Sequence, residues 1–210
     1  MKIIPFEGNY NPVKKHVFET YENISKDFSK TRYNIWGKNK EFLDMLPKGA
    51  LVIDAGCGNG RNSILYPDLM WISMDACLGL LKDVKDSNHP VRGSLDKLMF
   101  RKGVFDAVNC TAVLHHISGE DNRIRVFQGL IDLLRCGGLL YLQVWQKEQD
   151  KFNHLDNCDI LMSFTKNVDM RYYHLYNINE FDRLCNTVNG IKILDIGVDK
   201  GNYYIICEKN

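Results

Sequence analysis

The sequence lacks any apolar run approaching the roughly 20 residues of a membrane-spanning helix, and its first residues, Met1 to Pro5, lack the apolar core of a secretory signal. It also lacks an excess of either charge, because 27 Lys and Arg against 26 Asp and Glu leave a net charge of +1. Whole-chain charge therefore does not indicate a nucleic-acid partner. These absences predict a protein of the cytoplasm or nucleus with no membrane attachment.

Paired cysteines are absent as well. The seven cysteines stand singly, without a C-x-x-C pair, at Cys57, Cys77, Cys110, Cys136, Cys158, Cys185 and Cys207. A zinc site built from this chain alone is not indicated, and no metal is expected. The pattern favours buried, reduced thiols over disulfides.

What the chain does contain is a regular alternation of strand and helix patterns. With 45% hydrophobic and 25% charged side chains, its 210 residues predict one globular domain over residues 1–210. Strands are expected at 50–53, 70–74, 91–93, 104–110, 139–145, 192–198 and 203–207, and helices at 11–28, 36–46, 76–85, 120–134 and 179–188. A polar stretch up to Asp169 follows Lys147. The alternation predicts an α/β fold, a mostly parallel sheet with helices on both faces and an antiparallel strand from the closing hairpin.

A glycine-rich loop between a buried strand and a helix is the most informative segment. Gly56, Gly58 and Gly60 follow Asp54, and Asp75 ends the next strand, where it is placed to accept two ribose hydroxyls. A dinucleotide fingerprint would need Gly or Ala at position 61, which is Arg61. The segment instead resembles motifs one and two of the seven-stranded, Rossmann-like methyltransferases that depend on S-adenosylmethionine (SAM).

Four more segments narrow the resemblance: residues 28–33 before Trp36, 111–116, 144–145 and 171–174. With the glycine loop they look like the eukaryotic tRNA wobble-uridine carboxymethyl methyltransferases, which esterify 5-carboxymethyluridine at the first anticodon position. The likeness covers residues 14 to 209. It implies the SAM-dependent fold, SAM as cofactor, and tRNA as substrate.

The resemblance also implies a donor site. Its cofactor-binding residues would be Arg32, Asp54, Gly56, Gly58, Gly60, Asp75, Ser94 and Leu95. A carboxylate such as Asp54 and a group of backbone N–H donors suit opposite ends of the donor's zwitterionic tail. The family usually carries Asp where this chain has Ser94, so the adenine amino group would meet a hydroxyl, with Asp96 as a substitute.

For the acceptor, the resemblance implies a carboxylate that is already an anion at neutral pH and needs no general base. Arg171 is the first choice to hold it, because a guanidinium can grip a carboxylate or phosphate. His116 is preferred to His115 for substrate contact. Tyr173 and His174 are expected to stack on or hydrogen-bond the flipped wobble base.

Two partners are expected from the resemblance: the tRNA anticodon stem-loop and a small zinc-binding activator protein. The activator would form a heterodimer by pairing with the sheet edge near residues 91–93. Phosphate contacts would come from basic clusters at 14–16, at 26 and 30, at 101–102, and at 123 and 125. The alternatives are a small-molecule methyltransferase of the same fold and a non-catalytic scaffold subunit.

Overall fold

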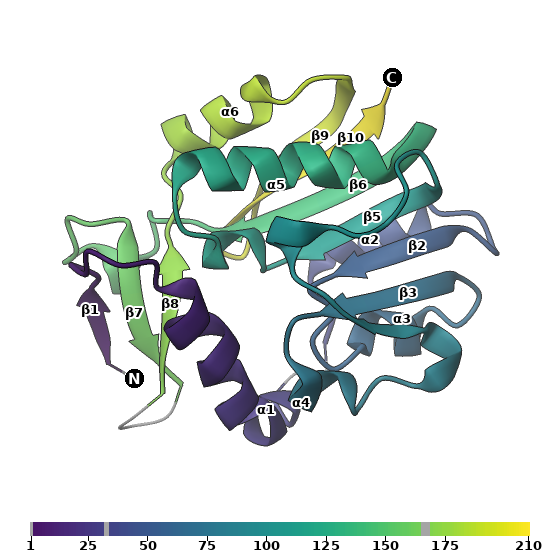
Figure 1. Ribbon diagram of the computed structural model, residues 1–210. Helices are drawn as coiled ribbons and strands as arrows, with labels where there is room; N and C mark the ends of the chain where they lie inside the picture. Colours follow the sequence, from purple (N-terminus) through teal and green to yellow (C-terminus); the bar gives the residue numbers. More distant parts are fainter. Residues whose placement is uncertain (1, 32–33, 165–168) are drawn as a thin grey trace.

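The computed structural model describes residues 2–31, 34–164 and 169–210, and its main element is a seven-stranded sheet (Figure 1). The strand order is β4-β3-β2-β5-β6-β10-β9. The bounds are β2 (Leu51–Ala55), β3 (Met70–Asp75), β4 (Pro90–Arg92), β5 (Phe105–Thr111), β6 (Leu134–Trp145), β9 (Ile191–Asp199) and β10 (Asn202–Lys209). The five neighbours β4, β3, β2, β5 and β6 pair in parallel, and β10 runs antiparallel to both β6 and β9. The predicted fold class is confirmed.

Helices cover both faces of this sheet. Helices α5 (Glu120–Leu133) and α6 (Ile178–Thr187) lie on one face, and α2 (Gly37–Asp44) lies on the other with the short α3 (Arg61–Leu65) (Figure 1). Strand alternation feeds both layers: Ile53 packs in the core with Phe127 of α5, whereas Val52 packs with Phe42 of α2. Neighbouring strand residues therefore anchor opposite helix layers.

A second, smaller sheet stands beside the first. It joins β1 (Ile3–Pro5), β7 (Asp159–Ser163) and β8 (Met170–His174) in antiparallel pairs. The sequence indicated no strand between 147 and 178, and that expectation is wrong. The apolar alternation of β7 covers only Ile160 and Met162, too short a signal among polar flanks. Residues 171–174 lie on strand β8.

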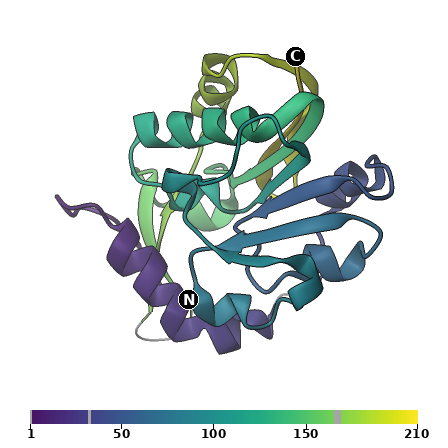
Figure 2. The same cartoon turned by 45° about the vertical axis from the view of Figure 1, so that its right-hand side comes forward.

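The first helical segment of the chain also differs from the sequence expectation. The single helix expected at 11–28 is a π-helical segment, η1 (Lys14–Glu19), that continues into α1 (Thr20–Ser29). These two segments run diagonally past the small sheet toward α4 (Leu78–Leu81), as the two views in Figures 1 and 2 agree. The Glu22 carboxylate accepts hydrogen bonds from the backbone N–H groups of Leu78 (2.7 Å) and Gly79 (2.9 Å). This contact ties α1 to the main sheet's helix layer.

The helix expected at 76–85 shortens to the four residues of α4. Beyond it, the N–H groups of Asp83 and Val84 bond the carbonyls three residues earlier, so tighter turns replace the helix. Other single turns are η2 (Asp86–Asn88), η3 (Leu95–Lys97), η4 (Leu114–His116) and η5 (Asp150–Phe152). None of the described helices is long and apolar enough to cross a membrane.

Candidate functional site

A cavity of about 450 Å³ opens where the parallel strands of the main sheet end. Its walls come from the loops after β2, β3, β4 and β5, the end of β6, strand β8, the β9–β10 turn, and η1 with α1. Carboxyl ends of parallel strands are where α/β sheets bind ligands. Of the predicted site residues, Gly56, Gly58, Asp75, Ser94, Leu95, His116 and Tyr173 line it.

The wall at β2 and β3 is a backbone cradle held by one carboxylate. The two Asp75 oxygens accept hydrogen bonds from the N–H groups of Gly58 and Cys77, both at 2.8 Å. Gly56 has φ +88°, and a Cβ there would lie 2.3 Å from Val113, so only glycine fits. Around Gly58 the space is open. Burial raises the pKa of Asp75, and the backbone donors partly offset this effect. The arrangement suits a ligand with hydroxyl donors.

Asp54 lies behind this wall and does not line the cavity. It is 1% exposed, and its oxygens accept from the side-chain amides of Asn62 (3.0 Å) and Asn109 (2.8 Å). Burial raises its pKa to about 6. The expected direct contact between Asp54 and a donor is therefore not what the structure shows; the carboxylate braces the loop. Gly60 also stays outside the lining, where its φ of +74° begins α3.

After β4, the lining changes to Ser94 and Leu95. The Ser94 hydroxyl donates to the Asp96 carboxylate, which itself does not line the cavity. A hydroxyl that donates its proton outward keeps two lone pairs to accept. Ser94, oriented by Asp96, is thus the acceptor available at this end. Arg32, the remaining predicted cofactor residue, lies outside the described residues.

Two neighbouring histidines after β5 differ in what they can still bond. The Nδ1 of His116 lies 2.6 Å from the Tyr172 carbonyl, which only accepts, so Nδ1 carries the proton and Nε2 accepts from the Tyr21 hydroxyl (3.0 Å). His115 accepts the backbone N–H of Trp145 at Nδ1 (3.2 Å), so its proton is on Nε2. Burial lowers the pKa of His116 to about 3 and that of His115 well below its usual value.

This difference reverses the order predicted from the sequence. His116 has both ring nitrogens engaged, whereas His115 lines the cavity with an Nε2–H that has no partner among the described residues. Both rings are neutral at pH 7 because burial penalises the charged form. His115 is therefore the donor available to a ligand, and His116 fixes the wall.

Tyr173 and Arg171 lie on the same side of β8, but only Tyr173 reaches the cavity. Its ring stacks on Trp145 at 4.6 Å and is 2% exposed. The Arg171 guanidinium lies behind it, 5.3 Å from the Tyr173 ring centroid and 5.2 Å from that of Phe164. Arg171 is 4% exposed and absent from the lining. The structure thus places Arg171 as support for the aromatic wall, not as a group in the cavity.

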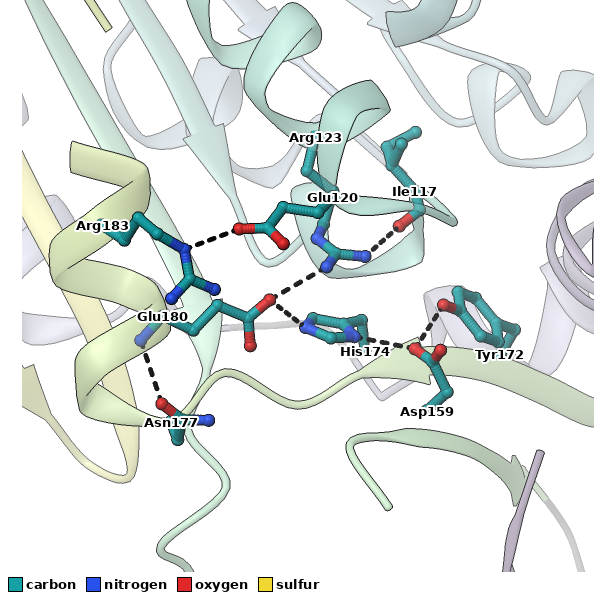
Figure 3. Close-up of polar contacts among 9 residues, drawn as sticks. All are labelled: Ile117, Glu120, Arg123, Asp159, Tyr172, His174, Asn177, Glu180 and Arg183. Atoms are coloured by element: carbon teal, nitrogen blue, oxygen red, sulfur yellow. Dashed lines mark hydrogen bonds and ion pairs between the residues drawn. The ribbon is translucent and has the colours of Figure 1, made fainter. Parts of the chain in front are cut away.

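His174, on the opposite side of β8, belongs to a buried charge network (Figure 3). Its two nitrogens lie 2.7 Å from the carboxylates of Asp159 and Glu180, and Arg123 lies 2.9 Å from Glu180. Burial alone would lower the pKa of His174, but the two carboxylates raise it. Two acceptor-only partners require two N–H donors, so the ring is an imidazolium. His174 therefore joins β8 to α5 and α6 and does not face the cavity.

The network also changes the predicted phosphate contacts. Arg123 is buried in the ion pair with Glu180, and His16 is buried between the Tyr10 hydroxyl and the Met170 carbonyl. Neither is available to a phosphate, whereas Arg125, Lys14 and Lys15 are not buried. One cation that the sequence did not single out, Lys200 in the β9–β10 turn, lines the cavity.

The cavity's chemistry follows from its titratable groups. Among its described lining residues, Asp75 is the only carboxylate, and it is held by backbone donors. The opposite wall presents a neutral imidazole N–H, aromatic rings and Lys200. No described group on that wall has a free basic lone pair for proton abstraction. The site can orient two ligands and stabilise an anion, and no metal-binding cluster occurs among the described residues.

Comparison with known proteins agrees with this picture. A family model described as a methyltransferase domain matches residues 53–142. A putative methyltransferase of Encephalitozoon cuniculi is 36% identical over 206 residues, covering 93% of this chain and 96% of that protein. The tRNA (carboxymethyluridine(34)-5-O)-methyltransferase of Schizosaccharomyces pombe is 29% identical over 222 residues, covering 93% and 97%.

Among solved structures, a chain of the complex between the Haloferax volcanii Trm112 methyltransferase activator and the putative methyltransferase is similar in fold. The TM-score is 0.66 at 14% identity, covering 91% of this chain and 95% of that one. At that identity the likeness concerns the fold alone.

Proposed function

The chain belongs to the SAM-dependent methyltransferases, and from that premise we propose that it methylates the carboxylate of 5-carboxymethyluridine at the tRNA wobble position. The names of its relatives in Schizosaccharomyces pombe and Saccharomyces cerevisiae support this substrate. The product would be the methyl ester.

One observation carries the proposal: the cavity wall opposite Asp75 contains donors but no base. An amine or hydroxyl acceptor has to lose a proton during methylation, and a histidine with a free lone pair would serve. His116 has none, and the His115 nitrogen available to a ligand already holds its proton. A carboxylate is ionised at pH 7 and needs only to be oriented and desolvated. The wall suits an acceptor of that kind.

The residues of the donor side fit SAM. Asp75 suits the ribose hydroxyls, the open backbone at Gly58 suits a close approach, and Ser94 can accept from the adenine amino group. SAM, when bound, supplies an electrophilic methyl on a sulfonium. The protein's part is to exclude water with Tyr21, Trp145 and Tyr173 and to hold the acceptor with the His115 N–H.

The test is methyl transfer from labelled SAM to three anticodon stem-loops that differ only at the wobble base. The first carries 5-carboxymethyluridine, the second carries 5-carbamoylmethyluridine, which is the uncharged amide of the first base, and the third carries plain uridine. We expect label only on the carboxylate, in a form released by mild alkali as an ester is. Label on uridine, or equal label on the amide, would contradict carboxyl methylation.

We also propose that a small zinc-binding activator covers the free edge of β4. This strand has three residues and, among the described strands, pairs only with β3. The methyl group of Met99, a residue that is 66% exposed, lies next to Gly93, which directly follows the strand. The rival is β9, which among the described strands pairs only with β10 and exposes Ile196 and Val198 by 41% and 54%.

Two variants separate these edges, Met99→Lys beside β4 and Ile196→Lys on β9. Each is co-expressed with the activator, and complex formation is measured by gel filtration. We expect Met99→Lys to lose the complex and Ile196→Lys to keep it. The reverse result would assign the interface to β9, and a lone chain that is stable and fully active would refute the partner.

A further inference from the structure

The cavity spans the ends of six neighbouring strands, from β4 to β10, and this width separates two kinds of wall. Asp75 and Ser94 lie after β3 and β4, whereas Lys200 lies just before β10. Adjacent strands are about 4.8 Å apart, so the ends of β2 and β10, three steps apart in the sheet, are about 14 Å from each other. Lys200 is therefore at the end of the cavity away from the donor residues.

Lys200 occupies a turn position that does not favour lysine. Asp199 and Asn202 pair, so Lys200 and Gly201 form a two-residue hairpin loop, with φ of +48° and +76°. This is the pattern of a type I′ turn, in which Asn, Asp or Gly is preferred at the first position. A lysine there is strained, and such strain is retained where the side chain has another use.

The turn is also fixed in place by its neighbours. The Asn202 side-chain amide donates to the carbonyls of Asp199 and Lys200, both at 3.1 Å. Gln149 donates to the Gly201 carbonyl at 2.6 Å, and the Asp199 carboxylate accepts from the Lys38 N–H at 3.1 Å. These contacts hold the backbone at the cavity rim, so the Lys200 side chain starts from a defined point.

The charge of Lys200 is uncompensated. It forms no ion pair in the part of the chain that the structure describes, although it is exposed and lines the cavity. The nearest carboxylate along the chain, that of Asp199, accepts the backbone N–H of Lys38 at the start of α2 and forms no ion pair with Lys200. The other described cation in the lining is Arg61, which follows the glycine loop on the donor side. An anion in the far half of the cavity would thus meet Lys200.

We propose that Lys200 binds an anionic group of the acceptor substrate, either its carboxylate or a flanking phosphate. This inference rests on the proposed function, since it assumes an RNA that carries a carboxymethyl group. It assigns to the β9–β10 turn a role in substrate affinity, distinct from the donor contacts of β2 to β4.

The informative variant is Lys200→Asn, because asparagine relieves the turn while removing the charge. A merely structural lysine predicts a protein as stable as the wild type or more so, with unchanged kinetics. Our proposal predicts that same stability, unchanged SAM affinity, and a KM for the carboxymethyluridine stem-loop raised about tenfold, as expected for a lost charge-assisted hydrogen bond. Lys200→Arg should restore most of the affinity.

The control is Lys192→Asn, which removes the same charge from an exposed position of β9 that does not line the cavity. It should leave KM unchanged. The free nucleoside 5-carboxymethyluridine, which has no phosphate, separates the two anions. Weaker binding of both nucleoside and stem-loop assigns Lys200 to the carboxylate, and weaker binding of the stem-loop alone assigns it to a phosphate.

Stem-loop affinity, measured by fluorescence anisotropy without turnover, keeps the inference separate from the proposed function. A wild-type protein that transfers no methyl group even when it is co-expressed with the activator refutes the function, while the anisotropy comparison still decides Lys200. Equal affinities of the wild type and Lys200→Asn would overturn the inference. So would a loss of SAM affinity in that variant, because Lys200 would then serve the donor.

Discussion

The two halves of the cavity are built in opposite ways. The donor half takes Gly56, Gly58, Asp75 and Ser94 from consecutive strand ends within one stretch of chain. The acceptor half takes His115, Trp145, Tyr173 and Lys200 from distant segments and two different sheets. The first half is held by backbone hydrogen bonds to one carboxylate, and the second by side-chain packing and a buried charge network. A substitution in one half should therefore impair the function of that half and leave the other half intact.

The largest expected effect on stability comes from Glu180→Gln, which disrupts the buried charge network that supports the acceptor half. The variant leaves Arg123 and His174 buried beside an amide where they now have a carboxylate. Breaking a buried ion pair in this way should lower the free energy of unfolding by about 3–5 kcal/mol, as measured by urea denaturation. SAM affinity of the folded protein should persist, because β8 contributes nothing to the donor half.

Arg183→Gln is the matched control for that variant, because it removes one partner of the exposed Arg183–Glu120 pair nearby. It should lower the free energy of unfolding far less than Glu180→Gln does, because solvent screens an exposed ion pair. If Glu180→Gln abolished SAM binding while the protein stayed folded, the two halves would not be independent.

Asp75→Asn tests the donor half in the same way, because it removes the carboxylate that holds the backbone cradle. Its amide would place N–H donors against the N–H of Gly58 or Cys77, opening the cradle. With hydrogen bonds to a charged group worth about 1.5–3 kcal/mol each, we expect SAM affinity to fall about 100-fold by isothermal titration calorimetry. Binding of the stem-loop alone should change little. Asp86→Asn, at an exposed position outside the cavity, serves as the control.

The two histidines sharpen the comparison within the acceptor half. His115→Phe keeps a ring but removes the Nε2–H, and it should lower kcat about tenfold with SAM affinity unchanged, as expected for a lost charge-assisted hydrogen bond. His116→Phe should instead destabilise the protein, because it strips partners from Tyr21 and the Tyr172 carbonyl. Steady-state kinetics and thermal unfolding of both variants decide the assignment, and equal kinetic losses would remove the distinction.

The same contrast explains what the sequence could and could not predict. Gly56 and Asp75 were predictable because a strand, a loop and the next strand end carry them at fixed spacing. The role of Lys200 was not predictable from the sequence. Its turn reaches the cavity, beside the end of β6 and the loop after β2, only because β10 pairs with β6. Arg171 and His174 were picked out as residues, but their positions depend on β7, whose signal is only a few residues long. Alternation along β8 puts His174 on the opposite face from Arg171 and Tyr173, where the carboxylates of Asp159 and Glu180 meet its ring.

The smallest effect, and the finest separation, is in the pH dependence of stability. His115 and His116 have lowered pKa values in the folded state, so below the unfolded value of about 6.5 the unfolded chain binds more protons. Each then removes stability as the pH falls, by up to about 1.4 kcal/mol per pH unit. His174 has the opposite sign. Its pKa is raised, so its contribution is complete below about pH 6.5 and is lost as the pH rises through the folded value.

Two variants show which histidine causes each pH dependence of the free energy of unfolding, measured by urea denaturation from pH 5 to pH 8. Relative to the wild type, His116→Gln should flatten the acid side, since glutamine can donate to the Tyr172 carbonyl and accept from Tyr21 without titrating. His174→Gln should change the slope only above about pH 6.5. The raised pKa values of Asp54 and Asp75 act in both proteins of each pair and cancel in the difference. A slope change in the pH window of the other histidine would mean that the cavity wall and the charge network titrate as one unit.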